Sequence, residues 1–199
     1  MNRAWFRITA VSAAVATAAI VLTVAPTSAE PREGPAPVAA ARADWTLSPM
    51  RVITAPGMHL FEHRFETTFD DMGQIIMAEV DELLQTVSEN DVPAAGQVVF
   101  RYIGVGPDRA KPFTLCLGVP VPADTKPAGK YQVVPLEPFR AASALYNGSV
   151  DTIPMAYGKL VPEMIAAGHV PSEEAREVYL YWEGRESANN VVWIQMGMR

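Results

Sequence analysis

The spacing of apolar residues along the chain changes from two to nearly four. Residues 50–54 and 60–68 alternate between apolar and polar, which predicts two short strands on either side of a Pro-Gly turn. In the residues that follow, apolar positions recur at intervals of three and four, which predicts an amphipathic helix with acidic residues on its other side. The apolar positions of this helix are Met72, Ile75, Ile76, Val80, Leu83, Leu84 and Val87. We expect Asp70 or Asp71 to cap it and Asn90 to end it in a left-handed conformation.

Two further strands follow this helix, and the same order of elements then returns. Residues 98–103 and 113–121 are typical of strands around a glycine-containing loop. The second half has predicted strands at 131–135 and 139–146, a helix at 153–165, and strands at 176–182 and 191–198. Thr152 is a candidate cap of the second helix, and Gly168 is expected to end it. We expect a kink at Pro162, because an interior proline removes a hydrogen bond at a cost of about 3 kcal/mol.

Similar residues recur in the two halves at a spacing of about 78 positions. The matching pairs are Ile75 and Ile153, Leu83 and Val161, Val87 and Ile165, Val92 and Val170, and Pro93 and Pro171; upstream, Val52 and Tyr131, and Pro56 and Pro135, match at 79. A repeat of this length predicts two copies of one strand-strand-helix-strand-strand unit, at about 45–122 and 128–199. We therefore predict an α+β fold, a twisted antiparallel sheet with two helices around a pseudo-two-fold axis, and a concave site at the seam.

The N-terminal residues have the pattern of an export signal. Residues 1–29 carry a short basic start with Arg3 and Arg7, then an uncharged apolar run, then small residues. We expect cleavage after Ala29, which would make the protein secreted or resident in the cell envelope; retention as a membrane anchor is the alternative. Residues 30–44 are rich in proline and alanine and predict a disordered linker before a folded domain at 45–199.

Charge and cysteine content narrow the possible partners. The chain has 16 Lys and Arg against 22 Asp and Glu, and loss of the two leader arginines would leave 14 basic side chains and a net charge of −8. This charge argues against nucleic-acid binding and mildly favours cationic ligands, and any membrane contact is expected only through an uncleaved leader. Cys116 is the single cysteine, so an internal disulfide and a thiolate metal cluster are excluded, and its apolar surroundings predict a buried, inert thiol.

The strand at 176–182 contains the candidate site. Alternation places Glu177, Tyr179 and Tyr181 on one face of this strand. A carboxylate beside phenol rings suits an amphipathic cation or an aromatic ligand, because each ring face adds cation–π attraction of about 0.5–2 kcal/mol. The alternative is that this face is simply solvated, since Glu and Tyr are tolerated on half-exposed strands.

Three further aromatic residues are candidates for the walls of the site. Tyr157 lies on the apolar side of the second predicted helix, where it is part of the core or of a pocket wall. Tyr146 has the same ambiguity, and Trp193 on the last strand either covers the hairpin or closes a cavity.

Sequence patterns for metals and for common catalytic centres are weak or missing. In an extended strand, His59 and His63 would lie about 13 Å apart, too far to share an ion, and His169 falls in a loop. The glycines at 104 and 106 are not followed by a helix that would hold a phosphate, and Gly-x-Ser-x-Gly is absent. We therefore expect no metal and no cofactor.

Two stretches resemble a known family. They are the run 117–121 (Leu-Gly-Val-Pro-Val) with Gly129 and the strand ending Val134-Pro135, and the run 156–160 (Ala-Tyr-Gly-Lys-Leu) with Ile165, Gly168 and residues 176–180. In this order they resemble GyrI-like effector-binding domains over approximately residues 50–199. These domains occur alone or fused to transcription regulators, and the resemblance implies a ligand pocket at the pseudo-two-fold seam. It also implies that Glu177 recognises lipophilic cations, with Tyr157 as a wall.

The chain departs from this family in two respects. Val192-Trp193-Ile194 stands where the family often has Thr-Glu-Ile, so a second acid is replaced by a large ring. The predicted leader, and the lack of a helix-turn-helix, argue against a DNA-binding regulator. SOUL-type haem-binding proteins are the nearest competing resemblance, but no histidine lies on a predicted pocket face.

Three functions follow as hypotheses. In the first, an exported domain binds a small hydrophobic, aromatic or cationic ligand, with Glu177 neutralising charge and Tyr157, Tyr179 and Trp193 stacking on it. In the second, the protein is a small-molecule hydrolase in which Glu177 is the base or nucleophile and Tyr179 or Tyr157 the proton donor. In the third, an envelope interaction protein fills the seam with its own side chains.

Overall fold

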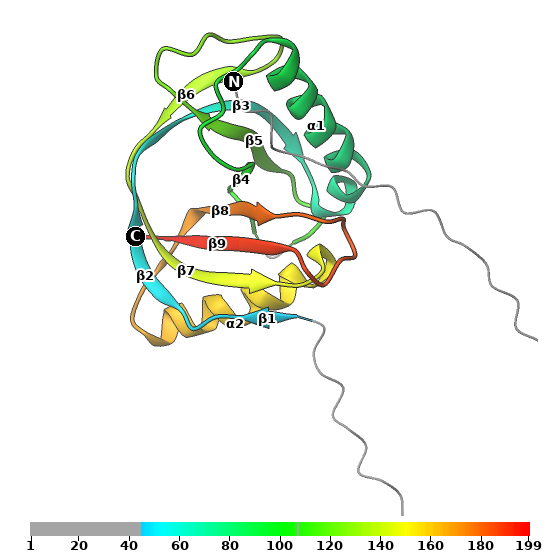
Figure 1. Cartoon of the computed structure of the whole chain (residues 1–199). Helices are drawn as coiled ribbons and strands as arrows, with labels where there is room; N and C mark the ends of the chain where they lie inside the picture. Colours follow the sequence, from blue (N-terminus) through cyan, green and yellow to red (C-terminus); the bar gives the residue numbers. More distant parts are fainter. Residues whose placement is uncertain (1–44, 107) are drawn as a thin grey trace, which may run out of the picture. The chain divides into compact units, whose positions relative to one another are not determined.

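The computed structural model describes residues 45–106 and 108–199, which form an α+β domain with a nine-stranded antiparallel sheet and two main helices (Figure 1). The fold class predicted from the sequence is therefore confirmed. The predicted signal peptide at 1–29 and the linker at 30–44 lie outside the described residues. No helix in the described part of the chain combines the length and apolar character needed to cross a membrane.

The elements follow the predicted order in both halves. In chain order they are β1 (Thr46–Leu47), β2 (Arg51–Ala55), β3 (Met58–Thr67), α1 (Phe69–Glu89), β4 (Val99–Ile103), β5 (Phe113–Val121), β6 (Gln132–Leu136), β7 (Phe139–Asn147), the short 3-10 helix η1 (Val150–Thr152), α2 (Ile153–Ala166), β8 (Pro171–Tyr181) and β9 (Val191–Met198). The strand predicted at 176–182 is longer than expected, because β8 begins at Pro171.

The strands exchange partners between the two repeats. The order across the sheet is β1-β7-β9-β8-β4-β5-β3-β6, and β2 also pairs with β7. The first long strand of each repeat thus pairs with the second strand of the other repeat: β2 with β7, and β6 with β3. Strands β4 and β8 meet in the middle, so the strand that carries Glu177 is central in the sheet.

The pairing register shows how the halves correspond. Phe100 lies opposite Leu117 in the first half, and Glu177 lies opposite Ile194 in the second, so equivalent positions are 77 residues apart. The fully buried Leu83 and Leu160 of the two helices have the same separation. The predicted register of 78 is therefore wrong by one residue. It matched residues by apolar character alone and paired Val87 with Ile165, which is 55% exposed.

The register in front of the helices differs again. Phe61 of β3 lies opposite Val119, and Ala142 of β7 lies opposite Met196, which is 77 residues after Val119, so β3 and β7 correspond at a separation of 81. The predicted value of 79 is thus also wrong. The second repeat is four residues shorter between strand and helix, because Phe61 and Leu83 are 22 residues apart (83 − 61) whereas Ala142 and Leu160 are 18 apart (160 − 142). The separation therefore falls from 81 to 77 between these positions.

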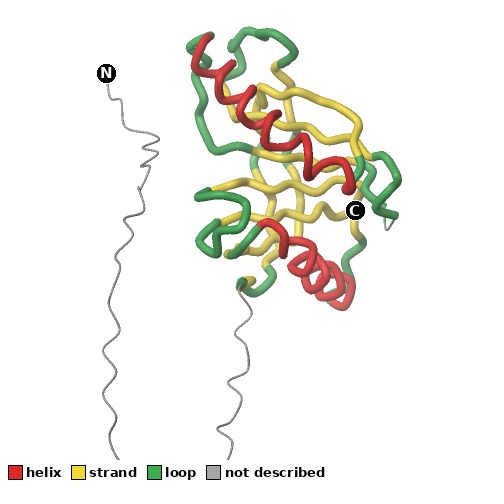
Figure 2. The backbone as a smooth tube through the Cα atoms, turned by 90° about the vertical axis from the view of Figure 1, so that its right-hand side faces the viewer, coloured by secondary structure: helices red, strands yellow, loops and turns green. Residues whose placement is uncertain are grey.

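Both helices lie on one face of the sheet, each over its own half (Figure 2). Helix α1 packs Leu83 against Phe61 and Leu115, and α2 packs Leu160 against Val192 and Ile194. These two apolar cores are continuous, because Tyr157 and Tyr179 contact both.

The helix ends differ in detail from the predictions. The cap of α1 is Thr68, whose side chain accepts a hydrogen bond from the backbone of Asp71, so neither predicted acid is the cap. The left-handed residue after α1 is Asp91, with φ of 50°, and not Asn90. Thr152 occupies the cap position of α2 without a side-chain bond, the helix continues through Pro162, and Gly168 has φ of 83° beyond its end.

The other face of the sheet buries a group of charged residues. Arg101 donates two hydrogen bonds to Glu62, at 3.0 and 2.8 Å, and a third to Glu174 at 3.1 Å. Arg176 donates to Glu174 at 2.7 Å and stacks on Phe139. These ion pairs link β4 to β8 on the face away from the helices, although Nη1 of Arg176 is buried without a hydrogen-bond partner.

Candidate functional site

Glu177 lies at the centre of the sheet on the face that the helices cover. It is opposite Phe100 of β4 and Ile194 of β9, and the row continues to Leu117 and Ala144. Since Phe100 and Glu177 are equivalent positions and also face each other, the pseudo-two-fold axis passes between them. A carboxylate that is only 3% exposed thus stands in a row of apolar residues, where burial of charge is costly.

Two phenols bind this carboxylate. The hydroxyls of Tyr102 and Tyr179 each donate a hydrogen bond to Oε2 of Glu177, both at 3.0 Å. Tyr102 comes from β4 and Tyr179 from β8, and the two are 77 residues apart, so they are equivalent positions of the two halves. The repeat therefore supplies a symmetric pair of donors to a single acid on the axis.

A third phenol approaches from the second helix. The hydroxyl of Tyr157 is buried and lacks a partner in good hydrogen-bond geometry, yet it lies near enough to Glu177 to lower the pKa of the carboxyl. Helix α2 thus places the Tyr157 hydroxyl near the carboxylate of Glu177 without a well-formed hydrogen bond between them. Such a hydroxyl is available to a ligand or to water.

The electrostatics of this group are dominated by burial. Burial raises the pKa of Glu177, and hydrogen bonds from Tyr179, Tyr102 and Tyr157 only partly oppose the rise. Burial and the nearby carboxylate raise the pKa of all three phenols well above the ordinary value of 10, so they stay protonated donors. In the described residues no Lys, Arg or His forms an ion pair with Glu177, and the carboxylate has no cation of its own.

Aromatic rings surround the acid. The ring of Phe100 lies 4.6 Å from that of Tyr179 and 6.4 Å from that of Tyr102, measured between centroids. Phe69, the first residue of α1, stacks on Tyr102 at 6.5 Å, and Trp182 meets Tyr179 edge-on at 6.0 Å. Ring faces and a carboxylate together form the surroundings that favour an organic cation.

The structure brings some of the residues predicted from the sequence to Glu177 and keeps others away. Tyr157 and Tyr179 are beside it. Tyr146 is fully buried under α2, where its hydroxyl is taken up by the carbonyl of Ser149 and the hydroxyl of Thr152. It is a core residue of the second half.

Tyr181 and Trp193 do not share the face of Glu177, so their predicted places are wrong. A bulge between Tyr179 and Tyr181 breaks the alternation, so Tyr181 is 51% exposed and donates to Glu183 at 2.8 Å. Trp193 lies opposite Val178, whose side chain points away from that of Glu177, and therefore belongs to the other face of the sheet.

The sequence reasoning missed Phe100 and Tyr102. A strand was predicted at 98–103, where β4 forms, and alternation would have placed both rings on one face. What was lacking was the register: with a separation of 77, Tyr102 corresponds to Tyr179 and Phe100 to Glu177, whereas 78 matches them to residues of the opposite face.

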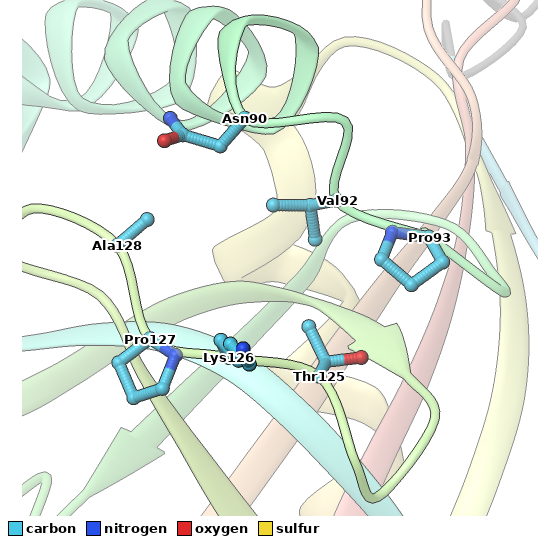
Figure 3. Close-up of a pocket in the computed structure, with 7 residues that line it drawn as sticks. All are labelled: Asn90, Val92, Pro93, Thr125, Lys126, Pro127 and Ala128. Atoms are coloured by element: carbon cyan, nitrogen blue, oxygen red, sulfur yellow. The ribbon is translucent and has the colours of Figure 1, made fainter.

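The site is closed in this structure. Glu177, Phe100 and Tyr102 are buried, whereas Tyr157 and Tyr179 are partly exposed and form its boundary with solvent. A surface pocket of about 290 Å³ lies elsewhere, between the end of α1 and the loop before β6 (Figure 3). It is lined by Asn90, Val92, Pro93, Thr125, Lys126, Pro127 and Ala128. Because Glu177 is only 3% exposed, access to it requires side chains or a loop to move.

The histidines and acidic residues of the described chain do not form a metal site. Among residues 45–106 and 108–199, no three His, Cys, Asp or Glu side chains converge to hold an ion. His63 lies 3.1 Å from Glu79 at the edge of the first half, and not beside Glu177.

Comparisons with known proteins agree with this architecture. No protein-family model and no curated protein matches the sequence. Among solved structures, the C-terminal domain of EcmrR is similar with a TM-score of 0.61 and 16% identity, covering 76% of this chain and 97% of that domain. SAV2435 bound to tetraphenylphosphonium is similar with a TM-score of 0.56 and 13% identity, covering 76% and 94%.

A third solved structure is a hydrolase encoded by lin2189 from Listeria innocua. It has a TM-score of 0.52 and 10% identity, and the match covers 75% of this chain and 91% of the hydrolase. At these identities the likenesses establish the fold and not the activity. The chain therefore has the fold of GyrI-like effector-binding domains, as its resemblance implied.

Proposed function

We propose that this protein is an exported binding protein that holds a lipophilic cation against Glu177 between the two halves of the sheet. The observation that carries the proposal is a buried carboxylate whose partners are phenols alone. An uncompensated buried charge is costly, and a bound cation would offset that cost. The rings of Phe100, Tyr102 and Tyr179 would supply the apolar and cation–π contacts.

The fold comparison supports the class of ligand. SAV2435 has the same fold and was solved with tetraphenylphosphonium, a cation whose charge is surrounded by phenyl rings. Such a molecule matches a single acid placed among rings. The net negative charge of the chain would also attract cations from solution.

Titration of the parent and of Glu177→Gln with tetraphenylphosphonium, followed by tryptophan fluorescence, tests this proposal. Truncating one partner of a buried charge pair costs about 2–5 kcal/mol, so the variant should bind at least about 30-fold more weakly. Binding of neutral triphenylphosphine oxide should change little, because it does not need the charge. Equal affinity of both proteins for the cation would exclude Glu177 as the recognition group.

Hydrolysis is the second candidate function. The observation in its favour is the raised pKa of Glu177, because a carboxyl shifted toward neutral pH is better suited to proton transfer. Against it, Oε2 of Glu177 already accepts two phenol hydrogen bonds, and the raised pKa values of these phenols make them poor proton donors. Turnover of 4-nitrophenyl acetate by the parent, lost in Glu177→Gln, would favour hydrolysis.

Export is the part of the proposal that depends on the leader-like residues 1–29. N-terminal sequencing of the protein recovered from the medium or the cell envelope tests it. We expect the mature chain to begin at Glu30. Recovery of the intact chain from the cytosol would contradict export and leave the binding proposal unaffected.

A further inference from the structure

The loop that joins β8 to β9 has a fixed internal structure. Glu183 accepts hydrogen bonds from Ser187 at 2.7 Å and from Asn189 at 2.8 Å. The buried Asn190 donates to the carbonyls of Gly184 and Ser187 and accepts from the backbone of Glu183. Because its ends and its tip are bonded to one another, residues 182–190 can move as one body.

One side chain ties this loop to both helical regions. Arg185 contacts Oδ1 of Asp151 in η1, with Nε at 2.9 Å and Nη2 at 2.8 Å. Its Nη1 donates to the carbonyl of Gly73 in α1 at 3.2 Å. Figure 1 shows this loop between the start of α1 and the start of α2. Arg185 therefore bridges the two halves of the molecule at the helix N-termini.

The bridge lies next to the group around Glu177. Trp182, the first residue of the loop, contacts the ring of Tyr179, which donates to Glu177. Phe69, one turn before Gly73 in α1, contacts the ring of Tyr102, the other donor. Movement of the loop would therefore take Trp182 away from the ring of Tyr179.

The contacts that Arg185 makes with Asp151 and Gly73 can be broken at little cost. The side chains of Arg185 and Asp151 are 49% and 48% exposed, and exposed ion pairs add little stability. Gly73 of α1 lies under the guanidinium and has no side chain; a Cβ atom there would be 3.5 Å from Nη1. The guanidinium can therefore move away from α1 without meeting a side chain at this position. The side-chain contacts of Arg185 are thus ones that water can replace. On the side of α2 the loop is also held through its backbone, because the carbonyl of Arg185 accepts hydrogen bonds from the backbone of Val150 and the hydroxyl of Ser149, both at 3.1 Å. The contact with α1 depends on the side chain.

We propose that residues 182–190 are the gate of the Glu177 site and that Arg185 is its latch. This inference depends on the proposed function, since it describes how the cation reaches Glu177. The latch acts on the rates of opening and closing, and no group of Arg185 touches the ligand. Its removal should accelerate binding and release together, with little change in affinity.

Stopped-flow fluorescence with tetraphenylphosphonium measures both rates in the parent and in Arg185→Gln. We expect both rates to rise at least about threefold while Kd changes less than about twofold. Arg185→Lys keeps the charge but cannot reach both partners, so its rates should fall between the two. Arg199→Gln is the matched control, because Arg199 also forms an exposed ion pair, with Glu173 at 3.0 Å, outside this loop.

The outcomes separate the latch from the other possibilities. Unchanged rates in Arg185→Gln would overturn the proposal, and so would a change in the release rate alone, which would make Arg185 a ligand contact. If the parent binds no tetraphenylphosphonium, the proposed function fails, but hydrogen exchange still decides the gate. Arg185→Gln should then speed exchange in residues 177–190 without lowering Tm, and equal exchange would refute the gate.

Discussion

Removal of the Tyr102 hydroxyl tests whether the acid at the centre of the sheet is ionised and held by phenols. Tyr102→Phe deletes one hydrogen bond of 3.0 Å to Oε2 of Glu177 and leaves the ring in place. A hydrogen bond to a charged group contributes about 1.5–3 kcal/mol, whereas one between neutral groups contributes about 0.5–1.5 kcal/mol. The loss of stability should therefore depend on whether Glu177 is ionised.

The direction of the pH dependence follows from the raised pKa of Glu177. Stability from a group with a raised pKa is fully present below its unfolded value, here 4.5, and is lost as the pH rises through the folded value. The Tyr102 bond lowers that folded value, so its removal raises it further. Tyr102→Phe should thus cost about 1 kcal/mol more at about pH 8 than at about pH 4, which corresponds to somewhat less than one pKa unit.

Urea unfolding of the parent and Tyr102→Phe at both pH values, and again in the Glu177→Gln background, measures this difference. In the Gln background the cost of losing the hydroxyl should fall to that of a neutral bond at both pH values. Tyr181→Phe serves as the control, since this phenol is exposed and its removal should have no measurable effect. An equal loss at both pH values and in both backgrounds would refute an ionised Glu177.

Three further predictions concern the framework of the site. Arg101→Met should lower the free energy of unfolding by about 3–5 kcal/mol, because it leaves the buried Glu62 without its partner, and a loss below about 1 kcal/mol in urea would contradict this. Gly118→Ala should prevent stable folding, since its Cβ would overlap the Phe61 carbonyl, whereas Gly158→Ala, with open space around it in α2, should add about 1 kcal/mol; thermal melts compare the two. Cys116, whose pKa burial raises to about 12, should resist iodoacetamide at about pH 8 until the protein is unfolded, and rapid labelling of the native protein would show that it is accessible.

The order of elements followed from the sequence because period and turn residues are local properties. The helix that became α1 was visible in the apolar positions of residues 72–87. Glu177 became a candidate because alternation places it on one face of its strand with Tyr179, and because the family resemblance implies a role for it. The period and the alternation depend only on residues that are close in the chain, so both can be read from the sequence.

The rest of the site depends on neighbours in space. The bulge after Tyr179 moves Tyr181 to another side of the strand, and nothing in the alternation marks it. Tyr102 became a partner of Glu177 only through the pairing of β4 with β8, which a one-residue error in the repeat register conceals. A shift by one residue exchanges the two faces of a strand, so the one-residue error in the repeat register kept Phe100 and Tyr102 out of the predicted site.

The crossed pairing of β2 with β7 and of β6 with β3 makes the two repeats dependent on each other. Neither repeat alone could complete its own half of the sheet, because the strand at the outer side of each half comes from the other repeat. An isolated copy would have to take that strand from a second copy, so a dimer of single repeats with exchanged strands would have needed only a linker between its chains to give this fold. In that arrangement both central positions would have been identical by symmetry. Only after fusion could one become an acid and the other a ring.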